Sequence, residues 1–212
     1  MRGLWAEAPI RLFLAALAPL AVIVPLRLVL FVDANPLTIL VLGPAFEECL
    51  KLASVILALA LASLALRGGR DPELALRYWL FLLPGIVGGG FGLFEGLVAY
   101  PRQVGTLFTL RETAHATFVI LSMAAALEVW RSFDAPFVGI GVGLGTGLAG
   151  HIGFNILAVL TAFDPWTVLY LSVYLGGVLA LAVPALAWEV RRAPDSEETR
   201  AFLPARGRGV HP

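Results

Sequence analysis

The chain is a succession of long apolar segments separated by short polar stretches. A helix needs about 20 mostly apolar residues to cross the hydrocarbon core of a bilayer. Six segments reach that length, at residues 9–32, 36–66, 78–100, 106–130, 135–162 and 165–190. The stretches between them, such as "DANP", "RGGRDPE" and "RSFDAP", have the composition of loops. The sequence therefore predicts an all-α fold, a polytopic membrane helix bundle of about six transmembrane helices.

Composition supports this prediction and excludes other classes. Charged residues make up 14% of the chain, whereas soluble domains average about 25%. The formal net charge is zero, so no nucleic-acid partner is expected. A single cysteine, Cys49, excludes an internal disulfide, and its apolar surroundings predict a small core residue. Residues 1–190 are predicted to form one transmembrane domain, and the polar residues 191–212 a poorly ordered cytoplasmic tail.

Arginine residues set the expected orientation, because they are enriched in cytoplasmic loops. With a cytoplasmic N-terminus, eleven arginines lie on the inner side and only Arg27, Arg102 and Arg111 on the outer side. The sequence thus predicts a multi-pass protein of the cell membrane with both termini in the cytoplasm. Residues 1–34 could instead be a cleaved signal peptide, but the apolar stretch is long and Arg27 interrupts it just before the cleavage site.

Ionisable residues inside the apolar segments form four groups. A charged side chain at the centre of a membrane helix costs about 2.5–3.5 kcal/mol, so such residues call for an explanation. The groups are "FEECLK", "GFGLFEG", "RETAH" and "GHIGFN", each on a different segment. At about 1.5 Å per residue, all four lie roughly 7–17 Å below the predicted outer surface, which favours one shared site. Glu128 and Glu189 lie near predicted cytoplasmic ends and are expected to reach water.

Spacing within the groups places polar side chains in pairs on one helix face. Residues three or four apart are neighbours on a helix, so Lys51 can pair with Glu47 or Glu48. The same spacing joins Phe91 to Glu95, Arg111 to His115, and His151 to Asn155. Glycine runs flank two of the groups, "GIVGGGFG" and "GIGVGLGTGLAG", and glycine lets helices approach closely. Close packing is expected to draw the polar groups together.

Each group also has a plain structural explanation. A buried ion pair that fixes helix packing would account for the charged residues of "FEECLK". A glutamate hydrogen-bonded across helices would account for Glu95, and core histidines with hydrogen-bond partners for His115 and His151. Their common depth favours a functional site over separate explanations.

The residue types in the four groups suit the activation of water. A carboxylate can act as general base toward water, and a histidine or second carboxylate can orient that water. A His–Asn pair on one helical turn can donate hydrogen bonds to a developing oxyanion. Histidine and glutamate also suit zinc, although the H-E-x-x-H spacing is absent. Hydrolysis of an amide, with or without a metal, is the predicted chemistry.

Four short motifs follow in order on successive segments: E-E-x-x-K, F-x-x-x-E, a histidine, and H-x-x-x-N. The residues are Glu47, Glu48, Lys51, Phe91, Glu95, His115, His151 and Asn155. This order resembles the PrsW family of intramembrane proteases, which belongs to a wider group with the type II CAAX prenyl endopeptidases and the bacterial CPBP proteins. The resemblance covers about residues 36–160. It implies an endopeptidase that cleaves a membrane protein or a lipidated peptide.

The resemblance also implies roles for the residues. Glu47 rather than Glu48 would activate the water, and Glu48 and Lys51 would tune or hold it. Glu95 stands where the CAAX enzymes carry a histidine and would orient the water. The further implied site residues are His151 and Asn155 at the oxyanion, His115 as another catalytic residue, and Phe91 in support. Arg111, one turn from His115, is a further predicted supporting residue. A glutamate-dependent enzyme needs no cofactor; a metal-dependent one would hold zinc through Glu47, Glu95, His115 and His151.

Two other function classes use the same buried polar residues. Buried carboxylates and histidines form proton relays in transporters. The sequence shows no internal repeat, whereas transporters commonly have one. A non-catalytic membrane scaffold would use the polar pairs for packing alone.

Overall fold

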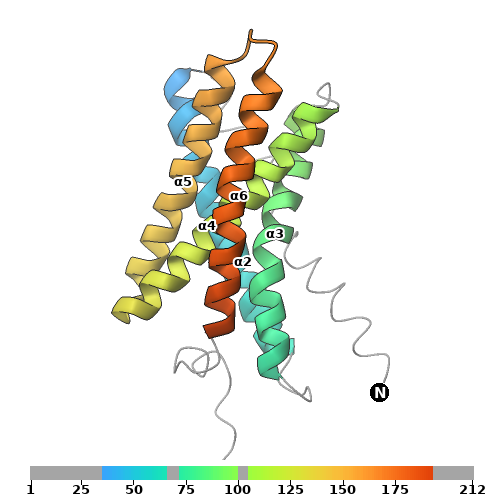
Figure 1. The fold of residues 1–212 in the computed structure, drawn as a ribbon. Helices are drawn as coiled ribbons and strands as arrows, with labels where there is room; N and C mark the ends of the chain where they lie inside the picture. Colours follow the sequence, from blue (N-terminus) through green and yellow to red (C-terminus); the bar gives the residue numbers. More distant parts are fainter. Residues whose placement is uncertain (1–34, 66–71, 100–104, 193–212) are drawn as a thin grey trace, which may run out of the picture.

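The computed structural model describes residues 35–65, 72–99 and 105–192, and this part of the chain is helical throughout apart from short connections. A short π-helix, η1, covers Thr38–Leu42 and leads into the first long helix. Five α-helices follow, listed in chain order: α2 (Gly43–Ala65), α3 (Pro72–Ala99), α4 (Thr106–Phe133), α5 (Pro136–Leu160) and α6 (Thr167–Arg192). Neighbouring helices run in opposite directions in one bundle (Figure 1). The predicted all-α class is therefore confirmed for the described residues.

Four of these helices, α3 to α6, are long and apolar enough to cross a membrane. Helix α2 is not among the four; it carries three charged residues, Glu47, Glu48 and Lys51, near its start. The first predicted segment, residues 9–32, and the predicted tail, residues 191–212, lie wholly or almost wholly outside the described residues. The structure supports an integral membrane protein, and six spans stay a prediction.

Helix bounds differ from the sequence prediction mainly at the start of α3. We expected this helix to begin near Tyr78, but it begins at Pro72, within the stretch "RGGRDPE". Proline is well tolerated at the first helical position, because its missing N–H has no partner there anyway. The stretch that the sequence predicts as a loop therefore also contains the first residues of the helix.

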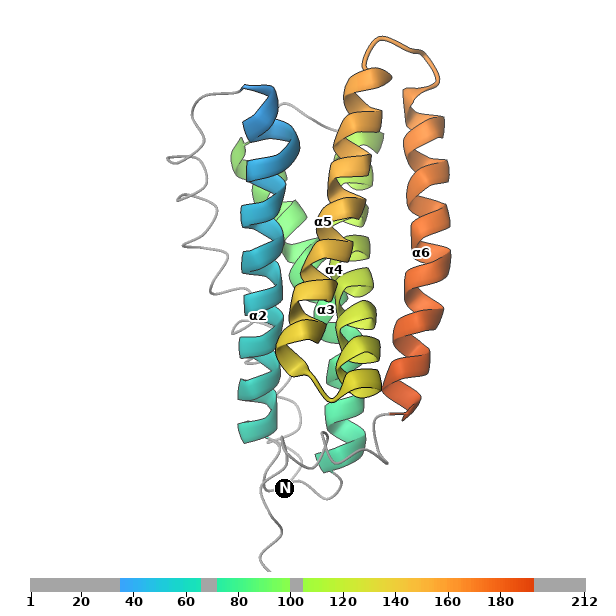
Figure 2. The same cartoon turned by 90° about the vertical axis from the view of Figure 1, so that its left-hand side faces the viewer.

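Helix α4 lies at the centre of the bundle and contacts each of the other four long helices. In Figure 2 it lies behind α5, between α2 on the left and α6 on the right. Half of the residues in the apolar segment of α4 are buried, compared with 17% of those in α6. A tight turn joins α4 to α5: Asp134 adopts a left-handed conformation at φ 49°, which aspartate tolerates better than most residues. The central position of α4 makes it the natural support for side chains that meet from several helices.

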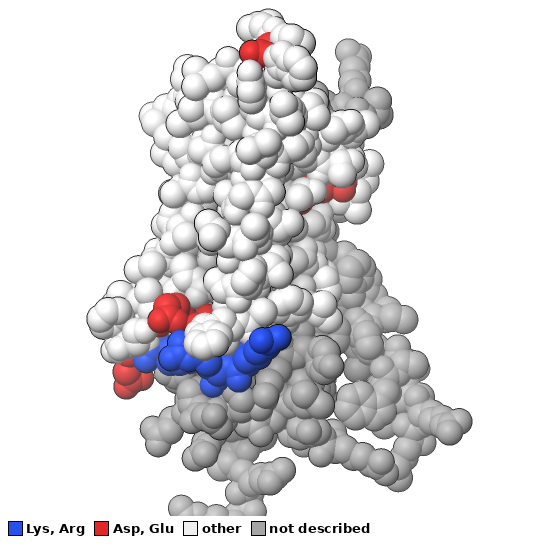
Figure 3. Space-filling model, in the orientation of Figure 1, with Lys and Arg blue, Asp and Glu red and all other residues white. Residues whose placement is uncertain are grey.

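Charged side chains of the described residues gather at one end of the bundle, where α4 and α6 end (Figure 3). Arg131 of α4 donates to the carboxylate of Glu189 on α6, and its second nitrogen donates to the Glu189 carbonyl at 3.2 Å. Glu189 is 2% exposed, so the expectation that it reaches water is wrong. The arginine from α4 supplies the partner that lets this carboxylate be buried. Glu128 is half-exposed, as expected.

The orientation of α2 corrects a second expectation. Cys49 was predicted to be a small core residue, but it is exposed. Its neighbours Glu48 and Lys51 face the interior, and a helix turns by about 100° per residue, so Cys49 must point away. The buried face of this helix carries Glu48 and Lys51 together with the apolar residues Leu52, Val55 and Ala58.

Candidate functional site

Six ionisable side chains from four helices meet inside the bundle. They lie near the start of α2, near the end of α3, and about two and a half turns from Thr106 of α4 and Leu160 of α5. All are at most 6% exposed: Glu47, Glu48, Lys51, Glu95, His115 and His151. The structure thus brings together all four polar groups that the sequence places at a common depth. Charged groups buried to this extent need partners, because an unpaired buried charge is costly.

Glu48 is held by two side chains. Its Oε1 accepts a hydrogen bond from Lys51 Nζ, one turn further along α2. The same oxygen lies 2.8 Å from Nδ1 of His151 on α5. Both contacts are fully buried, so Glu48 ties α2 to α5 through a charged hydrogen-bond network.

Lys51 joins this network to α3 and α4. Its Nζ lies 3.0 Å from Nδ1 of His115, and Nε2 of His115 lies 2.9 Å from Oε2 of Glu95. The side chain of Lys51 is completely buried. A continuous row of polar contacts therefore runs from Glu95 through His115, Lys51 and Glu48 to His151.

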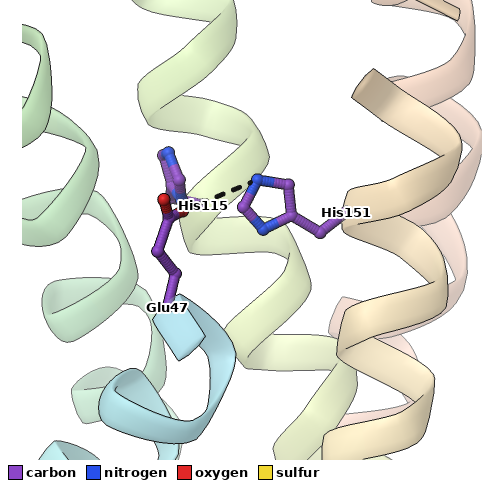
Figure 4. A group of neighbouring side chains, drawn as sticks. All are labelled: Glu47, His115 and His151. Atoms are coloured by element: carbon purple, nitrogen blue, oxygen red, sulfur yellow. Dashed lines mark ion pairs between the residues drawn. The ribbon is translucent and has the colours of Figure 1, made fainter. Parts of the chain in front are cut away.

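Glu47 faces the two histidines from the start of α2. Figure 4 shows its carboxylate directed toward the ring of His151, with His115 close by. Oε2 of Glu47 lies 3.8 Å from Nε2 of His151, beyond direct hydrogen-bond distance. For a polar contact longer than 3.5 Å, a bridging water is the group to consider first.

Aromatic rings frame the polar cluster. The ring of Phe91 lies 5.2 Å from that of His115, and its centroid is 5.1 Å from Lys51 Nζ. Phe118 stacks on His151, with ring centroids 5.5 Å apart and planes at 24°. The sequence motif includes Phe91, but sequence reasoning missed Phe118. Its position three residues after His115, on the same face of α4, was the available signal.

Glycines bring the helices close enough for these contacts. A Cβ on Gly92 of α3 would lie 2.8 Å from the backbone of Glu112 and 3.0 Å from Cδ2 of His115. A Cβ on Gly147 of α5 would lie 2.0 Å from Ser122 Oγ and 3.2 Å from Oε2 of Glu48. No larger residue fits at either position without moving the site. The prediction that the glycine runs pack helices closely around the polar groups is confirmed for α3 and α5.

Two predicted site residues lie at the margin of the cluster. Arg111 and Asn155 are partly exposed, and each lies one turn from a site histidine, toward the end of the bundle where α4 begins and α5 ends. Their predicted supporting and oxyanion roles stay predictions.

Three of the four predicted zinc ligands have the spacing of a metal site. Ligand atoms of Glu47, His115 and His151 all lie within 4.8 Å of one another. Both ring nitrogens of His115, however, are already in hydrogen-bond contact, Nδ1 with Lys51 and Nε2 with Glu95. A histidine binds a metal through an unprotonated ring nitrogen that faces the ion. Lys51 therefore competes with a metal ion for Nδ1 of His115, and zinc binding stays a prediction.

Comparison with known proteins gives no further guide, since no family model, curated protein or solved structure matches the chain. The function must therefore be argued from the cluster itself.

Proposed function

We propose that the protein is an intramembrane endopeptidase that hydrolyses a peptide bond of a membrane-associated substrate with a water activated by Glu47. The observation that carries the proposal is the 3.8 Å between Glu47 Oε2 and His151 Nε2 inside a fully buried cluster. A water bonded to both atoms would be held beside a carboxylate that can take its proton. The order of motifs that resembles the PrsW proteases supports the same assignment.

The contacts of the two adjacent glutamates support Glu47 as the base. Oε1 of Glu48 already accepts from Lys51 and lies 2.8 Å from His151 Nδ1, which leaves that oxygen in a positioning role. Glu47 instead faces the two imidazole rings (Figure 4). Glu48 then fixes the ring of His151 while Glu47 accepts the proton.

The reaction follows from these positions. The water oxygen attacks the carbonyl carbon of the substrate as Glu47 accepts a water proton. The C–N bond of the tetrahedral intermediate then breaks, and the Glu47 carboxyl group passes the proton to the departing amine. Asn155, one turn beyond His151, is the proposed donor to the oxyanion, a contribution that is worth roughly 10²–10³-fold in rate in other hydrolases. By the arginine distribution, the site would lie in the extracytoplasmic half of the membrane.

The direct test compares Glu47→Gln with the unaltered protein in liposomes. The probes are fluorogenic single-span peptides and a prenylated peptide. We expect the rate of cleavage to fall by about 10²–10⁴-fold, the usual contribution of a general base. Glu128→Gln is the matched control, because Glu128 is half-exposed and lies away from the cluster. Equal cleavage by Glu47→Gln and the unaltered protein, or cleavage of no probe by either, would refute the proposal.

A proton-coupled transporter is the second candidate, favoured by the row of polar contacts from Glu95 to His151. Titratable groups in contact inside a membrane form proton relays. In this case Glu95→Gln would abolish proton flux into liposomes, and Glu47→Gln would change no peptide cleavage. A scaffold without activity would show only a loss of stability in both variants.

A further inference from the structure

Lys51 has the surroundings of a bound cation. Its ammonium contacts the carboxylate of Glu48, lies 3.0 Å from Nδ1 of His115, and stands 5.1 Å from the centre of the Phe91 ring. An anion, a nitrogen lone pair and the face of an aromatic ring are all groups that attract positive charge. The side chain is completely buried, so these groups replace water around the ammonium.

The hydrogen-bond chemistry of lysine fixes the protons of His115. An ammonium only donates, so Nδ1 of His115 must accept from Lys51 and carries no proton. The proton of the neutral ring is then on Nε2, which donates to Glu95 Oε2 at 2.9 Å.

The opposite holds for the second histidine of the cluster. Nδ1 of His151 lies 2.8 Å from Oε1 of Glu48, a carboxylate oxygen that accepts, so this Nδ1 carries a proton. The two imidazoles are therefore protonated at different nitrogens. Their rings lie 5.1 Å apart and meet edge to face.

We propose that Lys51 is a built-in cation of this cluster: it holds His115 in its Nε2–H form and occupies the position from which a divalent metal would bind. A metal bound through Nδ1 of His115 would need the lone pair that Lys51 uses, and the ammonium repels a second cation beside it. Lys51 is thus a positioning residue that makes the cluster metal-free by construction. This inference concerns the proposed active site but does not depend on peptide hydrolysis.

Metal binding tests the inference directly. The protein is purified without a polyhistidine tag, treated with a chelator, and titrated with Co²⁺ and Zn²⁺. We expect no stoichiometric binding by the unaltered protein and one bound ion per molecule of Lys51→Met. The dissociation constant of the variant should be at least about tenfold lower than that of the unaltered protein. Lys51→Arg keeps the positive charge and is the matched control, expected to bind none. Adding His151→Ala to Lys51→Met should abolish the gained site.

Histidine protonation gives a second test that needs no variant at position 51. The chain has three histidines, so histidine-selective ¹⁵N labelling yields three ring patterns. We expect one neutral ring protonated at Nε2, for His115, and a proton on Nδ1 of His151. His211→Gln removes the third signal, and His151→Gln identifies the second. A proton on Nδ1 of His115, a stoichiometric ion bound to the unaltered protein, or no metal binding by correctly folded Lys51→Met would overturn the inference.

Discussion

The buried pair of Glu48 and Lys51 predicts a large coupling free energy between two residues one turn apart. Both side chains are at most 1% exposed, so removal of either leaves the other charge in an apolar interior. Breaking a buried pair on one side costs about 3–5 kcal/mol, whereas replacing both partners by neutral residues of similar volume is often close to neutral. We therefore expect Glu48→Gln and Lys51→Met each to lower the free energy of unfolding by about 3–5 kcal/mol.

The double variant gives the decisive value. If the two residues were independent, the losses of unfolding free energy in the two single variants would add in the double variant. Because the two side chains are in contact, the loss in the double variant should be much smaller than that sum. Glu48→Gln keeps an oxygen that can still accept from His151 Nδ1, so the measured loss is mainly that of the charge. We expect the double variant to recover at least about 3 kcal/mol relative to the sum of the singles.

Unfolding in mixed micelles with increasing SDS, followed by circular dichroism, measures these values. The matched control is the exposed pair of Glu128 and Arg192, whose side chains are 51% and 47% exposed at 3.4 Å. Its coupling should stay below about 1 kcal/mol. A coupling for Glu48 and Lys51 no larger than that of the control would refute the buried charge network.

Two further substitutions test the packing around the site and away from it. Gly92→Ala should lower stability by about 1–3 kcal/mol and shift the ¹⁵N signals of His115, because the added methyl meets α4 at 2.8 Å. Gly89→Ala, where the nearest atom is 4.0 Å away, should change neither quantity. Arg131→Met should lower stability by about 1–3 kcal/mol, less than a fully buried pair because Arg131 is 15% exposed and Glu189 keeps a second arginine nearby. It should leave the histidine signals unchanged; a shift in those signals would mean that the charged end and the cluster are linked.

The sequence predicted the location of the cluster from two properties together: the common depth of the polar residues and their helical spacing. Polar residues at a common depth on several apolar helices must meet if the helices pack, since lipid offers them no partner. The three- and four-residue spacings then select the face of each helix. They allowed Lys51 to pair with Glu47 or Glu48, and the structure has the pair with Glu48. The glycine runs supplied the close approach that the contacts require.

The contacts between helices could not be predicted from the sequence, because they depend on how each helix is rotated and shifted relative to its neighbours. The contact of Lys51 with His115 joins residues 64 positions apart, and nothing in either motif specifies it. Burial of Glu189 was mispredicted for the same reason, since its partner Arg131 comes from another helix. For Cys49 the prediction overlooked a signal in the sequence: burial of Glu48 and Lys51 turns Cys49 outward on the same helix.

Lys51 is the only lysine in 212 residues, and its side chain is completely buried. Any amine-reactive reagent added to the folded protein therefore has no accessible lysine to modify. Modification of this one residue requires that the helices around it separate. The rate of labelling at Lys51 thus reports how often the cluster opens, for a substrate or for unfolding, without any engineered probe.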